Sequence, residues 1–316
     1  MPQSACQVTA ELSVSIASYR TPALLRRCLE TVAAERAAVR LEVIVVDNGS
    51  RDGSAEMVAD QFPWVRLIRN DRNQGFAAAH NQALRGARGR YWLVLNSDAA
   101  PLPGALRTLV RFLDDHADVA VAGPKLRYPD GAVQPSRRRF PTVATLFLES
   151  TQLQRFFPTN RVLRRYYISD RSDDEVQDVD WLVGACLCVR AAAADEVGLL
   201  DARYFLYCEE LDWCRRVRAA GWRVVYVPSA EVAHVEGASS QLDLAARDRL
   251  FQASKLRYAA KWHGPWVAAA LRAYLVAENV ARAIEETAKL AVGSRTAERR
   301  ARLRLIGNGL RSALRG

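Results

Sequence analysis

Three polar residues, Asn96-Ser97-Asp98, follow the apolar run YWLVL and precede two prolines. A carboxylate directly after a buried strand can bind a divalent cation, because Mg²⁺ and Mn²⁺ prefer oxygen ligands and keep water or substrate oxygens in their other positions. A cation held in this way could bridge a diphosphate. The structural alternative is that Asp98 only begins the turn toward the prolines, as Asp often does.

Two other predicted strands also end in polar side chains. The first is followed by Ala17-Ser18-Tyr19-Arg20, and the second ends in Asp47. Because ligands of open α/β sheets bind beyond the carboxyl ends of the strands, we expect these groups to lie at one edge. Asp47 can accept hydrogen bonds from a base or a ribose, and Tyr19 or Arg20 can contact the base or a phosphate. Together these strand ends indicate a nucleotide site.

A third candidate is a group of carboxylates in the first turn of a predicted helix, Glu209, Glu210 and Asp212. Negative charge at a helix N-terminus is favourable in itself, which is the structural explanation. Three acids are more than one helix end needs, so one of them can serve as a general base.

The elements that must position these residues alternate between strand and helix. Apolar runs predict strands, and helical periodicity between them predicts helices, one of which begins at Pro22 with Thr21 as its N-cap. Short connections in this alternation predict an α/β fold with a mostly parallel sheet flanked by helices. The strands expected are 12–18, 42–47, 65–69, 91–96, 119–123, 181–189 and 223–227, and the helices expected include 76–88, 103–114, 209–220 and the segment from about 240 to the end.

Composition excludes some classes of protein. Half of the 316 residues are apolar and a quarter are charged, so the chain can build a core. The six cysteines form no CxxC pair, so we expect buried reduced thiols and no metal site built from them. The first residues lack the pattern of a secretory signal, and no stretch is apolar enough to span a membrane. We therefore expect a cytoplasmic protein, or one attached to the cytosolic face of the inner membrane.

Several segments, taken in order, resemble the inverting glycosyltransferases of family 2, which have the GT-A fold, and are most similar to the rhamnosyltransferase-like branch. They are VSIASYRTPALLRRCLET, EVIVVDNGSRDGS, NDRNQGFAAAHNQAL, YWLVLNSDAAPLPGAL, DWLVGACLCVRAAA, FLYCEELDWCRRVRAAGWRVVYVP and AHVEGASS. The resemblance covers about residues 11–240.

The resemblance implies roles for several residues. Asn96-Ser97-Asp98 stands where the family carries its DxD motif, so Asp98 is the charged metal ligand and Asn96 offers a neutral oxygen. His234, after a short loop from the strand RVVYV, is the second metal ligand, and an imidazole suits Mn²⁺ better than Mg²⁺. Glu210 stands at the position of the family's catalytic Asp and is the expected base, with Glu209 as its rival.

The resemblance also implies a donor site and an acceptor site. Asp212 orients a neighbour or binds the acceptor, and Trp181 and Gly184 fall where the family lines its acceptor and sugar pocket. The donor site comprises Ala17, Tyr19, Arg20, Asp47, Gly75, Asn81, Asn96, Ser97 and Asp98. In this group, Gly75 permits close backbone approach before a helix N-terminus, which favours anionic groups.

The implied activity is inverting transfer of a sugar, with rhamnose as the leading expectation, from a dTDP- or UDP-linked donor. The acceptor expected is a glycan or a lipid-linked glycan in bacterial cell-surface polysaccharide synthesis, and the cofactor is Mn²⁺ or Mg²⁺. Two alternatives remain from the residues themselves. One is a nucleotidyltransferase of similar architecture, and the other is a nucleic-acid-binding protein that uses its basic C-terminal helices.

Positive charge is concentrated at the C-terminus. Residues 241–316 hold 15 Lys/Arg against 6 Asp/Glu, which accounts for nine of the ten net positive charges. We therefore expect a catalytic domain over residues 1–240 and a basic helical extension over 241–316. Aromatic residues such as Trp262 and Trp266 lie among these charges, a pattern typical of helices that contact anionic membranes.

Overall fold

The computed structural model describes residues 10–158, 160–237 and 244–291, together with residues 303, 306 and 307. As far as they are described, residues 1–140, 171–205 and 209–239 form one compact unit, and residues 141–170, 206–208 and 240–316 form a second. Residues 141–170 thus join the C-terminal helices in one unit. The domain boundary expected at residue 240 stays a prediction.

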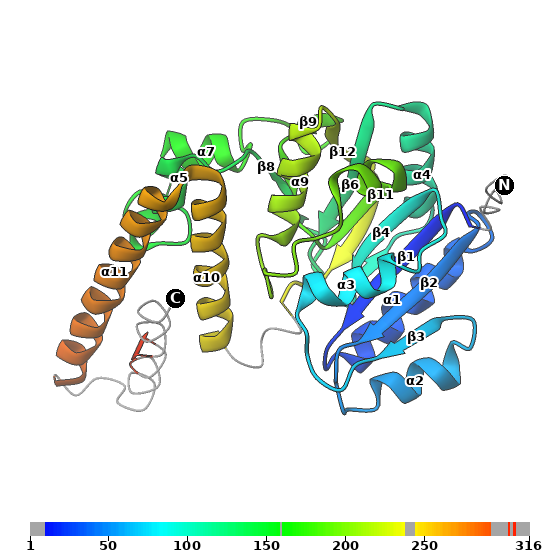
Figure 1. Cartoon of the computed structure of the whole chain (residues 1–316), viewed down its shortest axis with the longest axis horizontal. Helices are drawn as coiled ribbons and strands as arrows, with labels where there is room; N and C mark the ends of the chain where they lie inside the picture. Colours follow the sequence, from blue (N-terminus) through cyan, green and yellow to red (C-terminus); the bar gives the residue numbers. More distant parts are fainter. Residues whose placement is uncertain (1–9, 159, 238–243, 292–302, 304–305, 308–316) are drawn as a thin grey trace, which may run out of the picture. The chain divides into compact units, whose positions relative to one another are not determined.

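The first unit is built on a mixed sheet whose parallel half contains four strands (Figure 1). In spatial order these are β3 (Arg66–Arg69), β2 (Leu41–Asp47), β1 (Leu12–Ser18) and β4 (Tyr91–Asn96). Apolar β-branched residues dominate β2, as expected for a strand that is covered on both faces. The predicted mostly parallel α/β sheet is confirmed.

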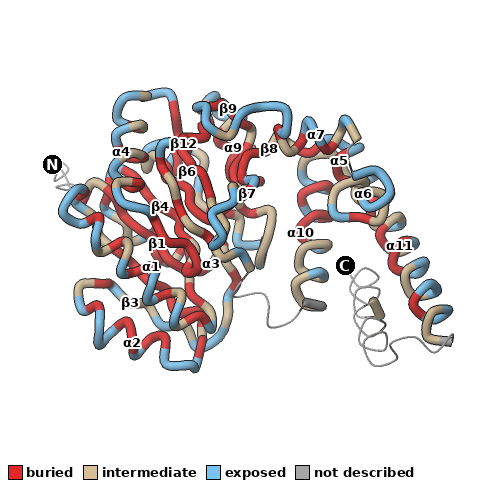
Figure 2. The backbone as a smooth tube through the Cα atoms, turned by 180° about the vertical axis from the view of Figure 1, so that it is seen from behind, coloured by how far each residue is buried: buried red, intermediate tan, exposed pale blue. Residues whose placement is uncertain are grey.

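Alternation along β1 directs its side chains to two different layers. Leu12, Val14 and Ile16 pack into the main core with α1 (Pro22–Glu35), α2 (Ser54–Gln61) and α4 (Ala105–Asp115). The opposite face is covered by α3 (Phe76–Leu84), where Ser15 Oγ lies 2.7 Å from Nδ1 of the fully buried His80. Figure 2 shows the strands as the most buried part of this unit.

The other half of the sheet continues from β4 in the order β11-β6-β12-β5. These strands are β11 (Cys186–Arg190), β6 (Val119–Arg127), β12 (Arg223–His234) and β5 (Ala99–Pro101). Strand β11 is antiparallel to both β4 and β6, while β12 is parallel to β6. Two short strands lie at the edges, β7 (Val133–Gln134) beside β6 and β9 (Gln177–Val179) beside β12.

Two predicted strands differ from the structure. The run 181–189 divides into β10 (Trp181–Leu182), which pairs with β8 (Arg137–Arg138) in a separate small sheet, and β11 in the main sheet. The strand expected at 223–227 instead runs on to His234, because an irregularity between Val227 and Glu231 lets it continue along β6 and β5. His234 is therefore the last residue of a strand and does not follow a loop.

The remaining helices of this unit are α8 (Ala191–Val197) and α9 (Glu209–Ala219). Helix α3 ends at Leu84, four residues before the predicted end. Thr21 precedes α1 as predicted, but its side chain caps no backbone N–H. Its hydroxyl instead lies 3.0 Å from Ser97 Oγ, which ties the start of α1 to the turn after β4.

The second unit is helical, with α5 (Val143–Leu148), α6 (Gln152–Phe156), α7 (Arg161–Tyr166), α10 (Leu244–His263) and α11 (Pro265–Ala291). Buried polar contacts join these helices: Lys255 Nζ donates to Glu149 O at 2.5 Å, and Gln152 N donates to Glu278 Oε1 at 2.7 Å. No helix among the described residues is long and apolar enough to cross a membrane. The helix expected over 292–302 lies outside the described residues.

No disulfide joins the cysteines of the described chain. Cys28, Cys186, Cys188 and Cys214 are buried and Cys208 is half-buried, while Cys6 lies outside the described residues. Burial raises the pKa of both Cys188 and Cys214 to about 12, so these thiols stay protonated near neutral pH. This agrees with the structural role expected for them.

Candidate active site

The carboxyl ends of β1, β2 and β4 meet, as the sequence predicts. Ser18 pairs with Asp47 across β1 and β2, and Ala17 pairs with Asn96 across β1 and β4. Asp47 is 6% exposed, and its Oδ2 accepts a hydrogen bond from Ser50 N at 3.3 Å. Its Oδ1 has no hydrogen-bond partner among the described residues. A buried carboxylate oxygen left in this state can accept a hydrogen bond from a ligand.

Tyr19 and Arg20 lie in the connection between β1 and α1. Arg20 is exposed, has a positive φ of 56° and places its guanidinium carbon 5.1 Å from the centroid of the Tyr19 ring. Its backbone N donates to Ser50 Oγ, the side chain of the loop after β2. This contact holds the two loops together beside Asp47, so both predicted side chains lie at the same strand ends.

The turn after β4 brings Asp98 and His234 together. Asp98 Oδ1 lies 3.3 Å from His234 Nε2, and Asn96 Nδ2 lies 3.3 Å from the same nitrogen. Both Asp98 and His234 are buried, at 8% and 3% exposure. The contact exists because β12 extends far enough to pair Ala99 with His234. The two predicted metal ligands therefore come from a turn and a strand end that are far apart in sequence.

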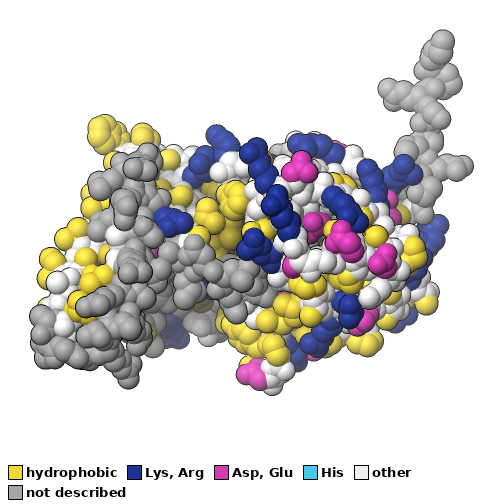
Figure 3. All heavy atoms as spheres, turned by 90° about the horizontal axis from the view of Figure 1, so that it is seen from below, with side chains coloured by type: hydrophobic (Ala, Val, Ile, Leu, Met, Phe, Trp, Pro, Cys, Tyr) yellow, Lys and Arg dark blue, Asp and Glu magenta, His cyan; other side chains and the backbone are white. Residues whose placement is uncertain are grey.

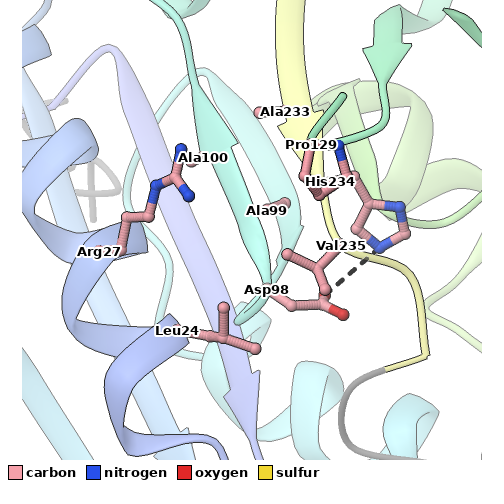
Figure 4. Close-up of a pocket in the computed structure, with 9 residues that line it drawn as sticks. All are labelled: Leu24, Arg27, Asp98, Ala99, Ala100, Pro129, Ala233, His234 and Val235. Atoms are coloured by element: carbon pink, nitrogen blue, oxygen red, sulfur yellow. Dashed lines mark ion pairs between the residues drawn. The ribbon is translucent and has the colours of Figure 1, made fainter. Parts of the chain in front are cut away.

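These two side chains also line a pocket (Figure 4). In Figure 4 the imidazole and the carboxylate face each other, while Leu24 and Arg27 approach from α1. The full lining is Leu24, Arg27, Asp98, Ala99, Ala100, Pro129, Ala233, His234 and Val235. Leu24 and Arg27 were not anticipated, because one apolar and one basic residue on an amphipathic helix give no sequence signal.

The residues fit a divalent cation that is shared with a substrate. The described residues contain no group of three His, Cys, Asp or Glu side chains that could hold a metal alone. One carboxylate and one imidazole still suit Mn²⁺, which takes its other ligands from water or phosphate oxygens. In addition, Asn96 Oδ1 is buried without a hydrogen-bond partner in the described chain. It is a neutral oxygen beside the two candidate ligands.

At the start of α9, Glu209 and Asp212 are buried and Glu210 is half-buried. Glu209 is 3% exposed, and Oε2 of both Glu209 and Glu210 lacks a hydrogen-bond partner among the described residues. Glu210 Oε1 accepts a weak hydrogen bond from Gly184 N at 3.4 Å. Burial raises the pKa of Glu210, and burial together with the charge of Glu210 raises the pKa of Glu209 well above its usual value. These two groups therefore bind protons more tightly than ordinary carboxylates do.

Two consecutive residues, Gly184 and Ala185, connect Glu210 to the end of β4 through their contacts. Gly184 lies against Glu210, since a Cβ built on it would be 3.4 Å from the Glu210 side chain. The next residue, Ala185, accepts a hydrogen bond from Asn96 N at 2.9 Å. The segment before β11 therefore lies between the expected base and the turn that carries Asp98.

Asp212 is fully buried and pairs with Arg216, whose Nε lies 3.1 Å from Asp212 Oδ2. The same guanidinium donates to Val197 O, Gly198 O and Leu199 O after α8. Of the two roles expected for Asp212, the structure favours orienting a neighbour over binding an acceptor.

Gly75 is required by close packing before α3. Its φ is +87°, and a Cβ there would lie 2.5 Å from Phe205 O.

Asn81, in contrast, already uses both ends of its amide: Nδ2 donates to Leu200 O at 2.7 Å, and Oδ1 accepts from Leu200 N at 3.1 Å. This pairing gives the buried Asn81 a structural role, so we leave it out of the proposed donor site.

Trp181 lies on β10, is 8% exposed, and donates from Nε1 to Arg139 O at 3.0 Å. It therefore supports the small sheet of β8 and β10, which carries Arg138. The positive charge of Arg138 lowers the pKa of Glu210 against the larger effect of burial. Arg138 was visible in the sequence only as part of a run of three arginines, and nothing in the run indicated a carboxylate nearby.

Comparisons with known proteins agree with this geometry. The family model for glycosyl transferase family 2 matches residues 13–171. An N-acetylglucosaminyl-diphospho-decaprenol L-rhamnosyltransferase of Mycobacterium tuberculosis is 34% identical over 243 residues, which cover 73% of this chain and 78% of the relative. The succinoglycan biosynthesis protein ExoO of Rhizobium meliloti is 33% identical over 156 residues, covering 49% of this chain and 44% of that protein.

Solved structures show the same fold at low sequence identity. A mannosyltransferase from Pyrobaculum calidifontis, in complex with GDP-Man and Mn²⁺, has a TM-score of 0.54 at 18% identity and covers 98% of this chain and 87% of its own. GalNAc-T7 with UDP, GalNAc and Mn²⁺ has a TM-score of 0.54 at 15% identity, covering 81% and 51%. The chain belongs to glycosyltransferase family 2, has the GT-A fold and is similar to its rhamnosyltransferase members.

Proposed function

We propose that this glycosyltransferase transfers a sugar with inversion from a dTDP- or UDP-linked donor to a lipid-linked glycan, with rhamnose as the leading candidate. The observation that carries the proposal is the arrangement of Gly184 and Ala185, because Gly184 lies against the half-buried Glu210 and Ala185 is hydrogen-bonded to Asn96, at the end of the strand that leads to Asp98. The similarity to a rhamnosyltransferase whose name includes diphospho-decaprenol supports both the sugar and the lipid-linked acceptor.

The donor lies across the strand ends in this proposal. Asp47 accepts a hydrogen bond from the base or the ribose through its unpaired Oδ1, and Tyr19 and Arg20 lie beside it. The diphosphate lies near Asp98 and His234, which would hold a divalent cation. When bound, this cation supplies Lewis-acid stabilisation of the negative charge on the leaving diphosphate.

Glu210 is the proposed general base. It removes the proton of the acceptor hydroxyl while the oxygen forms a bond to the anomeric carbon and the bond from that carbon to the diphosphate breaks. Backbone N–H groups and Arg138 lower the pKa of Glu210 against the effect of burial, whereas the charge of Glu210 adds to the effect of burial on Glu209. Glu210 is the member of the pair to which we assign proton acceptance, because backbone N–H groups and the charge of Arg138 favour its ionised form.

A thermal-shift screen of nucleotide diphosphates and nucleotide sugars, with and without Mn²⁺, tests the donor site. A ligand that binds only the native state raises the melting temperature. We expect a shift with one nucleotide that grows with Mn²⁺, and loss of the Mn²⁺ dependence in Asp98→Ala. The exposed Asp60→Asn serves as the control. If no nucleotide shifts the wild-type protein, the proposed donor site is wrong.

The second unit is the proposed contact with an anionic membrane surface. Six of the nine large hydrophobic residues that are exposed in the described chain lie in it, and Trp266 is 87% exposed. Figure 3 shows hydrophobic side chains at the surface of this unit, on the left of the view. Exposed aromatic residues on a positively charged unit are typical of proteins that bind anionic lipid. The cytosolic face of the inner membrane remains the predicted location.

Flotation with liposomes tests this contact. We expect binding to vesicles that contain anionic lipid, weaker binding at high salt, and a clear loss for Trp266→Ser. Leu102→Ser, which changes an exposed hydrophobic residue of the first unit, should float like the wild type. Failure to bind anionic vesicles at low salt would contradict the proposal.

A further inference from the structure

Gln134 lies directly behind the proposed metal ligand His234. It belongs to the two-residue strand β7, which pairs with β6 through Leu126, and its side chain is buried at 5% exposure. Gln134 Oε1 lies 2.8 Å from His234 Nδ1, while Gln134 Nε2 donates to Glu236 Oε2 at 2.9 Å. One amide therefore joins the imidazole to a carboxylate two residues farther along the chain.

The carboxylate determines which way the amide points. An ionised carboxylate can only accept hydrogen bonds, so Glu236 requires the NH₂ group of Gln134 on its side. The amide oxygen must then face His234 Nδ1, and this nitrogen must carry the hydrogen. In a neutral imidazole, Nε2 is left with its lone pair. It lies 3.3 Å from both Asn96 Nδ2 and Asp98 Oδ1.

Two further observations show that Glu236 and Gln134 are held in place. Tyr128, on the segment after β6, lies close to this carboxylate: burial, followed by the charge of Glu236, raises the pKa of its hydroxyl. Glu236 also has a φ of +63°, in the left-handed region that side chains other than glycine rarely adopt. Such a conformation costs free energy and persists only where the surrounding contacts fix it.

We propose that Gln134, held by Glu236, is a positioning residue that keeps a hydrogen on His234 Nδ1 and aims the lone pair of Nε2 at the cation site. This inference rests on the cation site of the proposed function. The contact behind a metal-bound imidazole selects its tautomer and orientation, and removing it typically weakens metal binding by about 10–100-fold.

The first experiment reads the tautomer of His234 without any metal. Long-range ¹H–¹⁵N correlations of the imidazole distinguish a protonated Nδ1 from a protonated Nε2, and with four histidines in the chain a His234→Gln variant assigns the signal. At mildly alkaline pH, where an imidazole is ordinarily neutral, we expect a hydrogen on Nδ1. We expect a mixture of tautomers in Gln134→Met, which keeps the side-chain volume but removes the acceptor.

The second experiment measures Mn²⁺ affinity by electron paramagnetic resonance in the presence of the nucleotide. Gln134→Met should weaken Mn²⁺ binding by about 10–100-fold. The exchanged pair Gln134→Glu with Glu236→Gln keeps an acceptor for Nδ1 and a donor beside it, so it should recover most of the affinity. Gln177→Met, which alters another buried glutamine on an edge strand, is the matched control and should bind Mn²⁺ like the wild type.

The outcomes separate this inference from the proposed function. A hydrogen on His234 Nε2 in the wild type overturns the role of Gln134, whatever the metal data show. Mn²⁺ affinity within about threefold of the wild type in Gln134→Met also overturns it, because the expected effect is at least about tenfold. If the wild-type protein binds no Mn²⁺, the proposed cation site is wrong. The tautomer of His234 still tests its hydrogen bond to Gln134 in that case. If Gln134→Met does not fold, the single variant Glu236→Met, at an exposed position, removes the acceptor that orients the amide and is used for both measurements, with the same results expected.

Discussion

Two buried groups of ionisable side chains lie at the candidate site, and their surroundings differ. At the end of β4 and β12, Asp98 lies beside His234, and the imidazole has Gln134 behind it. At the start of α9, Glu209 and Glu210 are adjacent, and each keeps an oxygen without a hydrogen-bond partner among the described residues. The first arrangement suits fixed binding of a cation. The second leaves carboxylates with raised pKa values, which suits proton transfer.

The largest effect on turnover is expected from a substitution in the second group, Glu209 and Glu210. Glu210→Gln should lower turnover by about 10²–10⁴-fold, because it removes the general base. Donor affinity should change little, since the side-chain hydrogen bond that the structure gives Glu210 is to Gly184 N and not to a group of the proposed nucleotide site. Glu209→Gln is the matched change one residue earlier and should cost much less. The measurements are single-turnover kinetics and donor binding, and a larger loss in Glu209→Gln would reverse the two roles.

The pH dependence of kcat/KM tests whether a carboxylate of the second group, Glu210, acts as the base. Burial raises the pKa of Glu210, so its carboxyl is protonated and inactive as a base at low pH. The value of kcat/KM should therefore rise with pH on an acid limb that lies above the ordinary pKa of a glutamate, then level off. Because the charge of Arg138 lowers the pKa of Glu210, Arg138→Met should move this limb to higher pH. The exposed Arg203→Met should leave it in place, and an unmoved limb in Arg138→Met would contradict the assignment.

The smallest effect on turnover is expected from a substitution of His80. This residue is buried like the two groups above, but we assign it no part in the reaction. Burial lowers the pKa of His80 from 6.5 to about 3, so the folded state holds it neutral while the unfolded state protonates it as pH falls. The stability it contributes is complete above pH 6.5 and is lost toward pH 3. Lowering the pH from 7 to 5 should cost about 2 kcal/mol of unfolding free energy through this group.

Urea unfolding at both pH values, with His80→Gln beside the wild type, measures this contribution. The variant should lose most of the pH dependence that His80 supplies, and its turnover at neutral pH should stay close to wild type. A steep loss of turnover in His80→Gln would place this histidine in the site, despite its position under α3 against Ser15.

Local patterns predicted the parallel half of the fold well. Strands β1 and β4 have the bounds expected from their apolar runs, and α9 differs by one residue. These elements lie in the centre of the unit, where burial imposes the pattern directly. Errors occur where pairing partners decide the ends: β12 continues past Val227 because β6 and β5 remain beside it, and 181–189 divides because its two parts pair with different strands.

The sequence by itself determined which residues stand at the strand ends and at the start of α9, since strand periodicity and the order of elements are local properties. Tertiary structure decided which of those polar groups have partners. Asn81 is paired to the backbone of Leu200, and Asp212 is paired to Arg216. The contact between Gln134 and His234 depends on the strand β7. This strand has only two residues, which is too short for a periodic pattern to predict it. Hydrogen bonds between side chains distant in sequence form only when packing brings them together, so no local pattern reveals them.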